Sequence, residues 1–355
     1  MNEMRALIDE TAGRIFRDLC TKELVDEAEK GVWPVDLWQT LEEAGLTVAS
    51  VPEELGGAGG AIGDTMAILR RAGRHAAPVP LADTFLAGWI LSGSGLSVPS
   101  GPLTLVMSHG GEGLEIERDG ETAWTLSGTA RRVPWASKAS HIVALATDGA
   151  TPMVAIVDPA GCAIAPGKNL AGEPRDDVTF NAVNISEDNV QPAGPLVDAE
   201  TIHRFGALTR SVLMAGALET ILGMSIEHAN VRMQFGRPIG KFQAIRQQLA
   251  VMGGQVAAAI KAADVAVEAV ESGDGRLEIA VAKARIGEAA GIAAEIAHQV
   301  HGAMGISYEH SLHQYTRRLW SWRDEFGAET EWQAEIGRRA AAKGADKLWT
   351  FISQT

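Results

Sequence analysis

Three long helical patterns in the C-terminal part of the chain constrain its fold more than any other feature. Apolar residues recur every three or four positions through Leu208–Leu222, Ile245–Val270 and Ile279–Val300. A short polar loop, Gly273-Asp274-Gly275, separates the second pattern from the third. Long helices joined by short loops pack side by side, and the many alanines here allow close contact between them. Residues 198–355 are therefore predicted to form a four-helix-type bundle.

The rest of the chain divides into two regions with different periodicity. Between residues 99 and 197, apolar and polar side chains alternate, as at Leu114 and Ile116, and Asp119-Gly120 and Asp148-Gly149 are typical of hairpin turns. This pattern predicts a middle β domain, a barrel or sandwich. Residues 1–98 show helices joined by Pro/Gly turns. The predicted fold class is α with a central β domain: an N-terminal helical domain (1–98), a middle β domain (99–197) and the C-terminal bundle (198–355).

Composition excludes several classes of partner. The 355 residues carry a formal net charge of −14, which argues against nucleic acid and anionic membrane surfaces. Cys20 and Cys162 are too few for a disulfide framework and lack metal-ligand spacing. The first 20 residues contain no apolar core like that of a signal peptide, and no uninterrupted run of about 18 apolar residues appears. We expect a cytoplasmic protein with no membrane or nucleic-acid partner.

The break between the first two helical patterns carries a motif. Residues 232–243, RMQFGRPIGKFQ, resemble the stretch Arg-x-Gln-Phe-Gly-x-Pro-Ile-x-x-Phe-Gln that joins the first two bundle helices in the acyl-CoA dehydrogenase family. VPEELGG (51–57) is similar to that family's Pro-Glu-Glu-x-Gly-Gly turn. QVHGAMG (299–305) is similar to its Gln-x-x-Gly-Gly-x-Gly segment, with Ala303 in place of one glycine. The order helical, β, helical bundle agrees, so the resemblance extends over most of the chain.

The resemblance implies an FAD site. A guanidinium offers planar, permanently charged donors to a pyrophosphate, and the free N–H groups that open the next helix also favour an anion. Arg232 alone would more often form a surface ion pair, but Gln234, Phe235 and Gln243 in register with it favour the cofactor role. Glycines at 302 and 305 would let backbone approach the cofactor closely. The predicted cofactor-binding residues are Arg232, Gln234, Phe235, Gln243, Gln299, Gly302, Ala303 and Gly305.

The elements that hold a flavin ring within the same subunit match the family poorly. Where family members have a stretch like Thr-Glu-Pro-x-Ala-Gly-Ser, this chain has VMSHGGEG (106–113). In place of a Trp-Ile-Thr-like strand it has RRVPWASKAS (131–140), where we expect Pro134 to interrupt the strand and Trp135 to fall too late. In the family, the matching elements 232–243 and 299–305 reach into a neighbour's site. The chain keeps the half of the site that serves a partner.

The catalytic base of the family has no clear counterpart. Dehydrogenation needs a carboxylate that takes a proton from the carbon next to the thioester carbonyl. The family positions for this group correspond here to Gly327 or Ala328, and to Thr209 before Arg210. Glu329 and Glu325 lie nearby, although a solvated loop carboxylate would explain either. Glu329 and Arg210 are the remaining catalytic candidates.

Other groupings are less specific. Glu309, His310 and His313 have a spacing that a metal could use, but solvated side chains explain them, and we expect no metal; Ser108-His109 has no triad context. Trp320 and Trp322 fit either the bundle core or an interface, or a ligand stack. Arg317-Arg318 fits either a phosphate contact or a surface ion pair.

The sequence therefore predicts an FAD-dependent acyl-CoA dehydrogenase, or a subunit of one, that desaturates an acyl-CoA thioester at its α,β carbons. The resemblance implies fatty acid or steroid side-chain β-oxidation, with electrons passed to an electron-transfer flavoprotein. We favour a tetramer of unlike subunits, α2β2, like those of steroid side-chain degradation, over a homo-oligomer. The alternative is a non-catalytic subunit that completes the FAD site of a catalytic chain and stabilises it.

Overall fold

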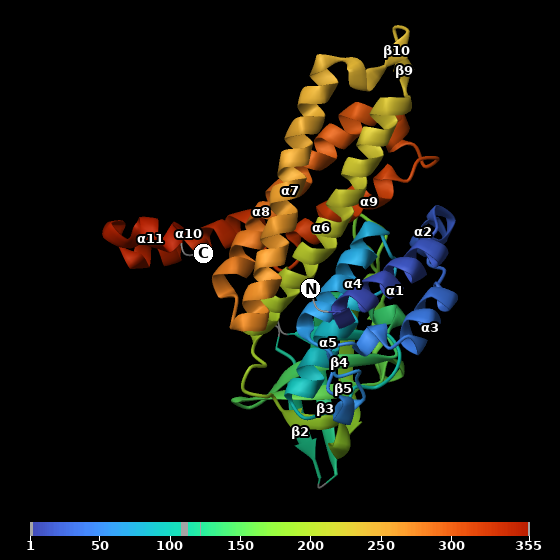
Figure 1. The fold of residues 1–355 in the computed structure, drawn as a ribbon. Helices are drawn as coiled ribbons and strands as arrows, with labels where there is room; N and C mark the ends of the chain where they lie inside the picture. Colours follow the sequence, from blue (N-terminus) through green and yellow to red (C-terminus); the bar gives the residue numbers. More distant parts are fainter. Residues whose placement is uncertain (1–2, 108–112, 121, 354–355) are drawn as a thin grey trace. The chain divides into compact units, whose positions relative to one another are not determined.

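The computed structural model describes residues 3–107, 113–120 and 122–353 (Figure 1). Contacts within the chain group it into two compact units. The first comprises residues 1–65 and 78–205, and the second comprises residues 66–77 and 206–355. The helical, β, helical order is confirmed. The division into three domains, with boundaries after residues 98 and 197, stays a prediction.

The first unit begins with helices. They are α1 (Glu3–Leu19), α2 (Lys22–Glu29), α3 (Val35–Glu43), α4 (Ile62–Arg74) and α5 (Leu81–Gly93), and α4 continues into the second unit. Nearly every residue of α5 is buried, which fits its mainly apolar sequence LADTFLAGWILSG. It packs against strand β1 of the sheet described next.

The β domain is one mixed sheet. Its strands are β1 (Leu103–Met107), β2 (Glu115–Asp119), β3 (Ala123–Pro134), β4 (His141–Asp148), β5 (Thr151–Val157), β6 (Ala163–Ala165), β7 (Arg175–Ser186) and β8 (Val190–Pro192). They run in the order β6-β7-β3-β2-β4-β5-β8, with β1 parallel to β4. Asp119-Gly120 and Asp148-Gly149 connect antiparallel hairpins, as predicted. Among the described strands the order ends at β6 and β8, so the sandwich prediction holds and a closed barrel is not formed.

The central strands are buried on both faces. Along β4, Ile142, Ala144 and Ala146 join a core enclosed by the sheet itself. Val143 faces the opposite side, where it packs with Ala87, Ile90 and Leu91 of α5. Because side chains alternate between faces with period two, burial of both faces requires apolar residues at every position. This requirement explains the nearly continuous apolar run in HIVALATDG.

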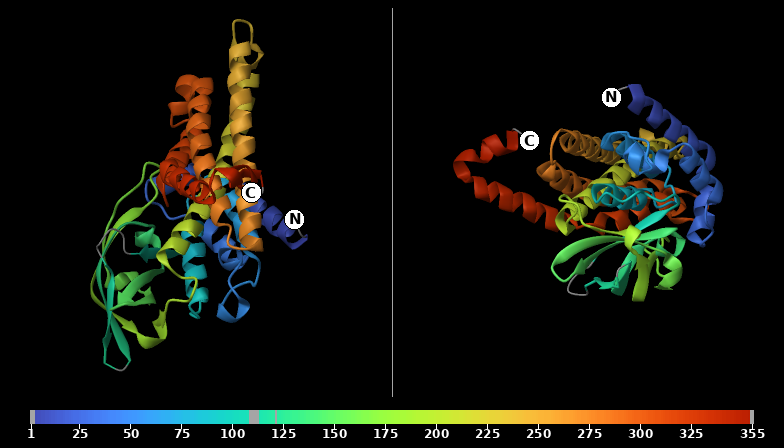
Figure 2. Two further views of the ribbon diagram at one scale, coloured as in Figure 1. Left: turned by 90° about the vertical axis from the view of Figure 1, so that its left-hand side faces the viewer. Right: turned by 90° about the horizontal axis from the view of Figure 1, so that it is seen from below.

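The second unit contains the predicted bundle (Figures 1 and 2). Its helices are α6 (Ala199–Val231, from residue 206 onward), α7 (Gln243–Ser272), α8 (Arg276–His301), α9 (Leu312–Asp324), α10 (Glu329–Lys343) and α11 (Leu348–Ser353). A small hairpin, β9 (Met233–Gln234) and β10 (Arg237–Pro238), joins α6 to α7. The three long helical patterns are thus confirmed, and the predicted motif lies at the end of the bundle where α6 is joined to α7.

By length and composition alone, α6 and α7 could each cross a membrane, although the sequence shows no uninterrupted apolar run. For α6, 78% of the apolar window is buried inside the protein, as in the core helix of a bundle. For α7 the buried share is only 28%. One face of α7 therefore leaves apolar surface exposed in the isolated chain.

Candidate functional site

The motif at 232–243 forms a tight hairpin at the end of the bundle. Gln234 pairs with Arg237, and the two residues between them, Phe235 and Gly236, both have positive φ, 50° and 77°. A two-residue turn of this kind suits the twist of a β hairpin but requires left-handed backbone, which is costly for phenylalanine. The Phe235 ring is 91% exposed. The turn therefore presents an aromatic side chain outward at a cost in local stability.

The hairpin is a cationic region in an acidic protein. Residues 228–263 contain no Asp or Glu, while four basic residues lie within 232–246: Arg232, Arg237, Lys241 and Arg246. Arg237 lies over the Phe242 ring at 4.3 Å, and Arg246 Nε donates to the Gly240 carbonyl at 2.9 Å. Among the described residues, Arg232 makes no ion pair, and its side chain is exposed at the end of α6. The arrangement leaves a guanidinium available to an external anion.

Helix α7 begins beside these cations. Its N-cap is Phe242, whose side chain accepts no hydrogen bond from the first turn, and that turn contains no acidic residue. The first N–H groups of the helix, starting at Gln243, therefore remain available, and the helix dipole adds partial positive charge there. Arg232, Gln234, Phe235 and Gln243 are brought together at this end of the bundle, as the motif implies.

The second predicted element lies at the end of α8. Gly302 follows the helix with φ 60° and ψ −143°, a conformation that only glycine adopts readily, and a β-carbon there would meet only open space. Gln299 and Ala303 are exposed. Gly305 is different, because a β-carbon there would press on His301 and Leu312. Gly302 offers open backbone to a ligand, whereas Gly305 lies inside the turn, where its cofactor contact stays a prediction.

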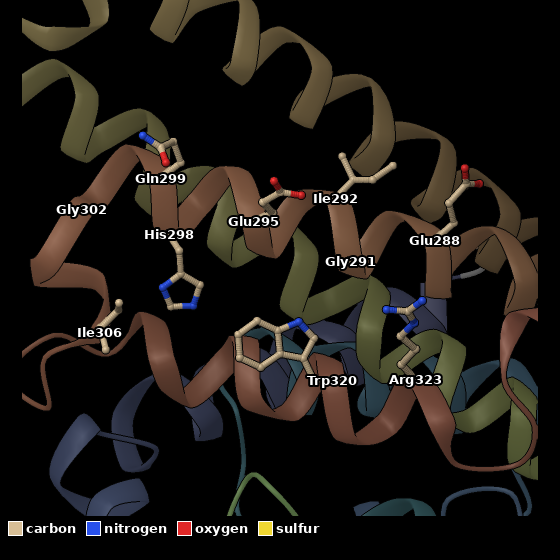
Figure 3. Close-up of a pocket in the computed structure, with 10 residues that line it drawn as sticks. All are labelled: Glu288, Gly291, Ile292, Glu295, His298, Gln299, Gly302, Ile306, Trp320 and Arg323. Atoms are coloured by element: carbon tan, nitrogen blue, oxygen red, sulfur yellow. The ribbon is translucent and has the colours of Figure 1, made fainter.

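An open groove of about 920 Å³ runs between α8 and α9 from this corner (Figure 3). Gln299 and Gly302 lie at one end of it, and Arg323 lies near the other. In its middle the Trp320 indole stacks on the His298 imidazole, with ring centroids 5.7 Å apart and planes 17° from parallel. Trp320 is half-buried and lines this groove, so its ligand-facing or interface role stays a prediction, while Trp322 is buried in the core.

A stacked histidine pair joins the two elements. His228 of α6 lies one turn before Arg232, and its ring stacks on that of His301, the last residue of α8, with centroids 4.4 Å apart. The sequence analysis missed this contact. Five of the chain's nine histidines, at 228, 298, 301, 310 and 313, lie near the motif segments, and this concentration was the available signal.

The two catalytic candidates lie in another cluster. Arg210 precedes Arg232 by 22 residues on α6, which corresponds to about 33 Å along the helix axis. The buried Arg210 guanidinium donates from Nε to Glu325 Oε2 at 2.6 Å and lies 5.4 Å from the centre of the Phe326 ring. Glu329 opens α10 and forms an ion pair with Arg323. Both candidate carboxylates, Glu325 and Glu329, are therefore engaged by arginines of the same bundle.

Lys283 fixes the turn between these carboxylates. It is 1% exposed, and its Nζ donates to the backbone carbonyls of Arg323 (2.6 Å) and Gly327. Burial lowers the pKa of this amine to about 8, although Glu329, Glu325 and Asp324 oppose the shift. The missed signal was a lysine on the apolar stripe of α8, four residues after Ile279.

The β-domain elements expected to hold a flavin ring are the stretches 106–113 and 131–140, and their mismatch with the family stays a prediction. Residues 108–112 of the 106–113 stretch lie outside the described residues. Strand β3 is not interrupted by Pro134 but ends there, where the missing N–H of proline is tolerated. Trp135 follows in left-handed backbone and is 7% exposed, with its ring against Trp33 at 6.3 Å. Its indole is packed inside the first unit.

The remaining sequence candidates have structural partners. Arg318 is 1% exposed and donates to the Gln314 carbonyl at 2.9 Å, so it is neither a surface ion pair nor a phosphate contact. His310 and His313 are both hydrogen-bonded within their turn. Across the described residues, no group of three His, Cys, Asp or Glu side chains is arranged to hold a metal.

Comparison with known proteins gives consistent matches. The model of the acyl-CoA dehydrogenase N-terminal domain matches residues 2–95, and that of the acyl-CoA dehydrogenase C-terminal domain matches residues 199–340. The chain is 28% identical to acyl-CoA dehydrogenase IpdE2 of Mycobacterium tuberculosis over 79% of each chain.

Two solved structures of complexes share the fold. One is the ChsE4-ChsE5 complex from Mycobacterium tuberculosis, with a TM-score of 0.85 and 23% identity over 97% of this chain and 99% of the other. The second is a variant of the Tcur3481-Tcur3483 steroid acyl-CoA dehydrogenase, with a TM-score of 0.84 and 26% identity over 96% of this chain and 98% of the other.

Proposed function

Because this chain belongs to the acyl-CoA dehydrogenase family, whose members are oxidoreductases acting on CH–CH groups, we propose that it is one subunit type of an FAD-dependent acyl-CoA dehydrogenase with unlike subunits. The assembly converts an acyl-CoA thioester to its 2,3-enoyl form in the cytoplasm and passes the electrons to an electron-transfer flavoprotein. Within it, this chain supplies a pyrophosphate clamp, by which we mean Arg232, the start of α7 at Gln243 and the open backbone at Gly302. The other subunit type supplies the flavin-ring pocket and the base.

The observation that carries this proposal is the contrast between the two halves of the FAD site. The half that serves a partner is exposed and cationic, at Arg232 and the uncapped start of α7. In the half that would serve the chain itself, the tryptophan near the expected ring position, Trp135, is packed against Trp33. A clamp for a partner's flavin needs only the first half.

The donors present fit the pyrophosphate of FAD. Arg232 would pair with a phosphate through its guanidinium, and the N–H groups at Gln243 would donate to the same anion. The open backbone at Gly302 and the groove behind Gln299 would receive the remainder of the nucleotide. When bound, FAD would accept a hydride from the substrate β-carbon. The residues of this chain bind and orient the cofactor and exclude water.

The exposed face of α7 supports assembly with other chains. Small and apolar residues gather there, namely Ala250, Val251, Gly254, Ala257 and Ala258, and all are exposed in the isolated chain. Small residues allow another helix to approach closely, and burying this surface would be favourable. The two similar solved structures are complexes of paired, differently named chains, which supports an α2β2 tetramer. The steroid substrate named for one of them supports an acyl group from a steroid side chain over a fatty acyl group.

The second candidate function is a non-catalytic subunit that only completes and stabilises a catalytic chain. The ion pairs of Glu325 with Arg210 and of Glu329 with Arg323 favour it, because neither carboxylate is left to take a proton. Both functions place the clamp in this chain. They differ in whether any of its residues takes part in proton transfer.

The proposed function is tested by co-expressing this chain with a family member from a neighbouring gene that keeps the Thr-Glu-Pro-x-Ala-Gly-Ser stretch and the catalytic glutamate. We expect the purified pair to show the visible absorption of oxidised flavin, and anaerobic addition of a steroid side-chain acyl-CoA to bleach it. A pair that retains flavin but is not reduced by any acyl-CoA would contradict dehydrogenation.

Glu329→Gln is expected to change kcat of the assembled protein by no more than a few fold. The glutamine keeps the side-chain volume next to Gly287 of α8 and loses the ion pair with Arg323 and the negative charge near Lys283. Glu335→Gln is the matched control, because Glu335 lies on the same helix and pairs with Arg339. A loss of about 10³-fold in kcat that is specific to Glu329→Gln would make Glu329 the base, because removal of an essential proton acceptor costs on that scale.

A further inference from the structure

Three histidine rings from three separate segments pack together at the corner that joins the two halves of the clamp. His301 stacks on His228, and the His310 ring is tilted by 59° against that of His301. His228 lies near the end of α6, His301 ends α8, and His310 precedes α9. The His228 and His301 centroids are 4.4 Å apart, and those of His301 and His310 are 4.8 Å apart. We call these three residues the histidine stack. It connects the helix end that carries Arg232 to the turn that carries Gly302.

Hydrogen bonds fix the protonation of two of the rings. Nδ1 of His301 lies 2.8 Å from the Ala297 carbonyl, so this nitrogen carries the proton, while the buried Nε2 has no partner. Nδ1 of His310 accepts from the backbone N–H of Leu312, the first residue of α9, at 3.1 Å, so this nitrogen carries none. The acceptor role of His310 Nδ1 requires a neutral ring, and the buried Nε2 without an acceptor favours a neutral ring at His301.

Protonation would be unfavourable at both rings. A proton on His301 would place a charged N–H inside the protein without an acceptor, which is costly. A proton on Nδ1 of His310 would remove the acceptor for the Leu312 N–H and place a positive charge at the start of α9, where the helix dipole disfavours it. Both rings would separate from their present partners to regain solvent.

The surroundings of the stack also disfavour charge. Burial lowers the pKa of each of the three rings below the usual 6.5. The positive charges of His301 and Arg232 lower the pKa of His228 further. The pKa of His310 is lowered further by the other two stack members and by His313 of α9. His298 of α8 is the remaining titratable group beside the stack, and burial lowers its pKa as well. Hydrogen bonds hold His298 to Thr316 and His313 to the His310 carbonyl.

We propose that the neutral histidine stack positions the flavin clamp, and that its protonation separates the Arg232 side of the clamp from the Gly302 side. This inference rests on the proposed function, because it regulates the same site. His228, His301 and His310 act through the clamp residues and are positioning residues. FAD, bound across both sides, would be released as the pH falls.

The direction of the pH effect follows from the lowered pKa values. In the unfolded chain these histidines bind protons near pH 6.5, whereas in the folded protein they resist protonation to lower pH. The free energy that holds the stack together is therefore fully present above pH 6.5 and is lost as the pH falls below it. The same window applies to the clamp and hence to FAD affinity.

The test compares the co-purified pair carrying wild-type chain, His228→Phe or His310→Gln. Phenylalanine keeps a flat ring in the stack but cannot be protonated, and glutamine keeps an acceptor for the Leu312 N–H. The FAD dissociation constant is measured at about pH 7.5 and about pH 5.5. We expect it to rise about tenfold in the wild type and less than about threefold in the variants. His141→Phe, at a half-buried histidine on β4, is the control and should keep the wild-type ratio.

Hydrogen–deuterium exchange of residues 298–312, corrected for the intrinsic pH effect, gives a readout that does not depend on flavin. Protection should fall below about pH 6.5 in the wild type and fall less in His228→Phe and His310→Gln, because each variant leaves only two of the three rings titratable. If the pair holds no FAD at neutral pH but hydrogen exchange follows this pattern, the proposed function is wrong. The pH-dependent separation of the histidine stack is then still supported. Equal pH profiles of wild type and variants in both measurements would overturn the inference. Variants that fold and show a weaker pH dependence in both would support it.

Discussion

Replacing Arg232 by alanine should lower the affinity of the assembled protein for FAD by roughly one to two orders of magnitude. A hydrogen bond to a charged group contributes about 1.5–3 kcal/mol, and one such contact with the pyrophosphate is removed. The exposed side chain of Arg232 makes no ion pair among the described residues, so its loss should leave the bundle folded. FAD titration of the deflavinated pair, with its thermal unfolding measured alongside, separates the two effects.

Arg276→Ala is the matched control for this substitution. Arg276 also lies at a helix end of the bundle and is partly exposed, but it opens α8 after the loop from α7, where it pairs with Asp274. Its replacement changes the net charge equally and should leave FAD affinity unchanged. Flavin affinity that is the same in Arg232→Ala and wild type would remove the pyrophosphate role from this side chain.

The fold could be predicted from sequence wherever burial imposes a period. Leu208, Val212, Ala215 and Leu218 recur at helical spacing, and each is at most 2% exposed. The β4 strand was recognised for a related reason, because burial of both faces left an apolar run bounded by an Asp-Gly turn. Periodicity does not show whether a sheet closes on itself, so the sequence could not distinguish a barrel from a sandwich. The pairing of the described strands shows that the sheet is not a closed barrel.

The clamp hairpin was predictable because its residues are neighbours in sequence. Arg232 to Gln243 span a turn whose geometry is set locally by Phe235 and Gly236. The motif therefore located four candidate residues within one small structure. The same local reasoning could not distinguish Gly302, which is open, from Gly305, which packs on His301 and Leu312.

The contacts that sequence reasoning missed join residues far apart in the chain. His228 and His301 are 73 positions apart, and Lys283 binds carbonyls 40 and 44 residues away. Backbone carbonyls carry no residue-type signal, so nothing in the sequence indicated the partners of Lys283. Similarly, the mismatch at Trp135 was visible, but its packing against Trp33, from the helical region, was not.

The central claim is that this chain completes a flavin site that it does not house alone. A homo-oligomer of such subunits would offer every flavin a pyrophosphate clamp and a poor ring pocket. Pairing with a subunit that keeps the ring pocket and the base completes one site in each unlike pair. The other interface in the α2β2 tetramer would combine the mismatched β domain of this chain with the partner's clamp and would hold no flavin.

The flavin content per chain tests this claim most directly. FAD released by heat denaturation is quantified against protein concentration, for this chain made alone and for the co-expressed pair. We expect far less than one FAD per chain and little activity for the chain alone, and two FAD per four chains for the pair, roughly half the content of a homotetramer with one site per subunit. One FAD per chain, in protein made without any partner and active on an acyl-CoA, would contradict the account.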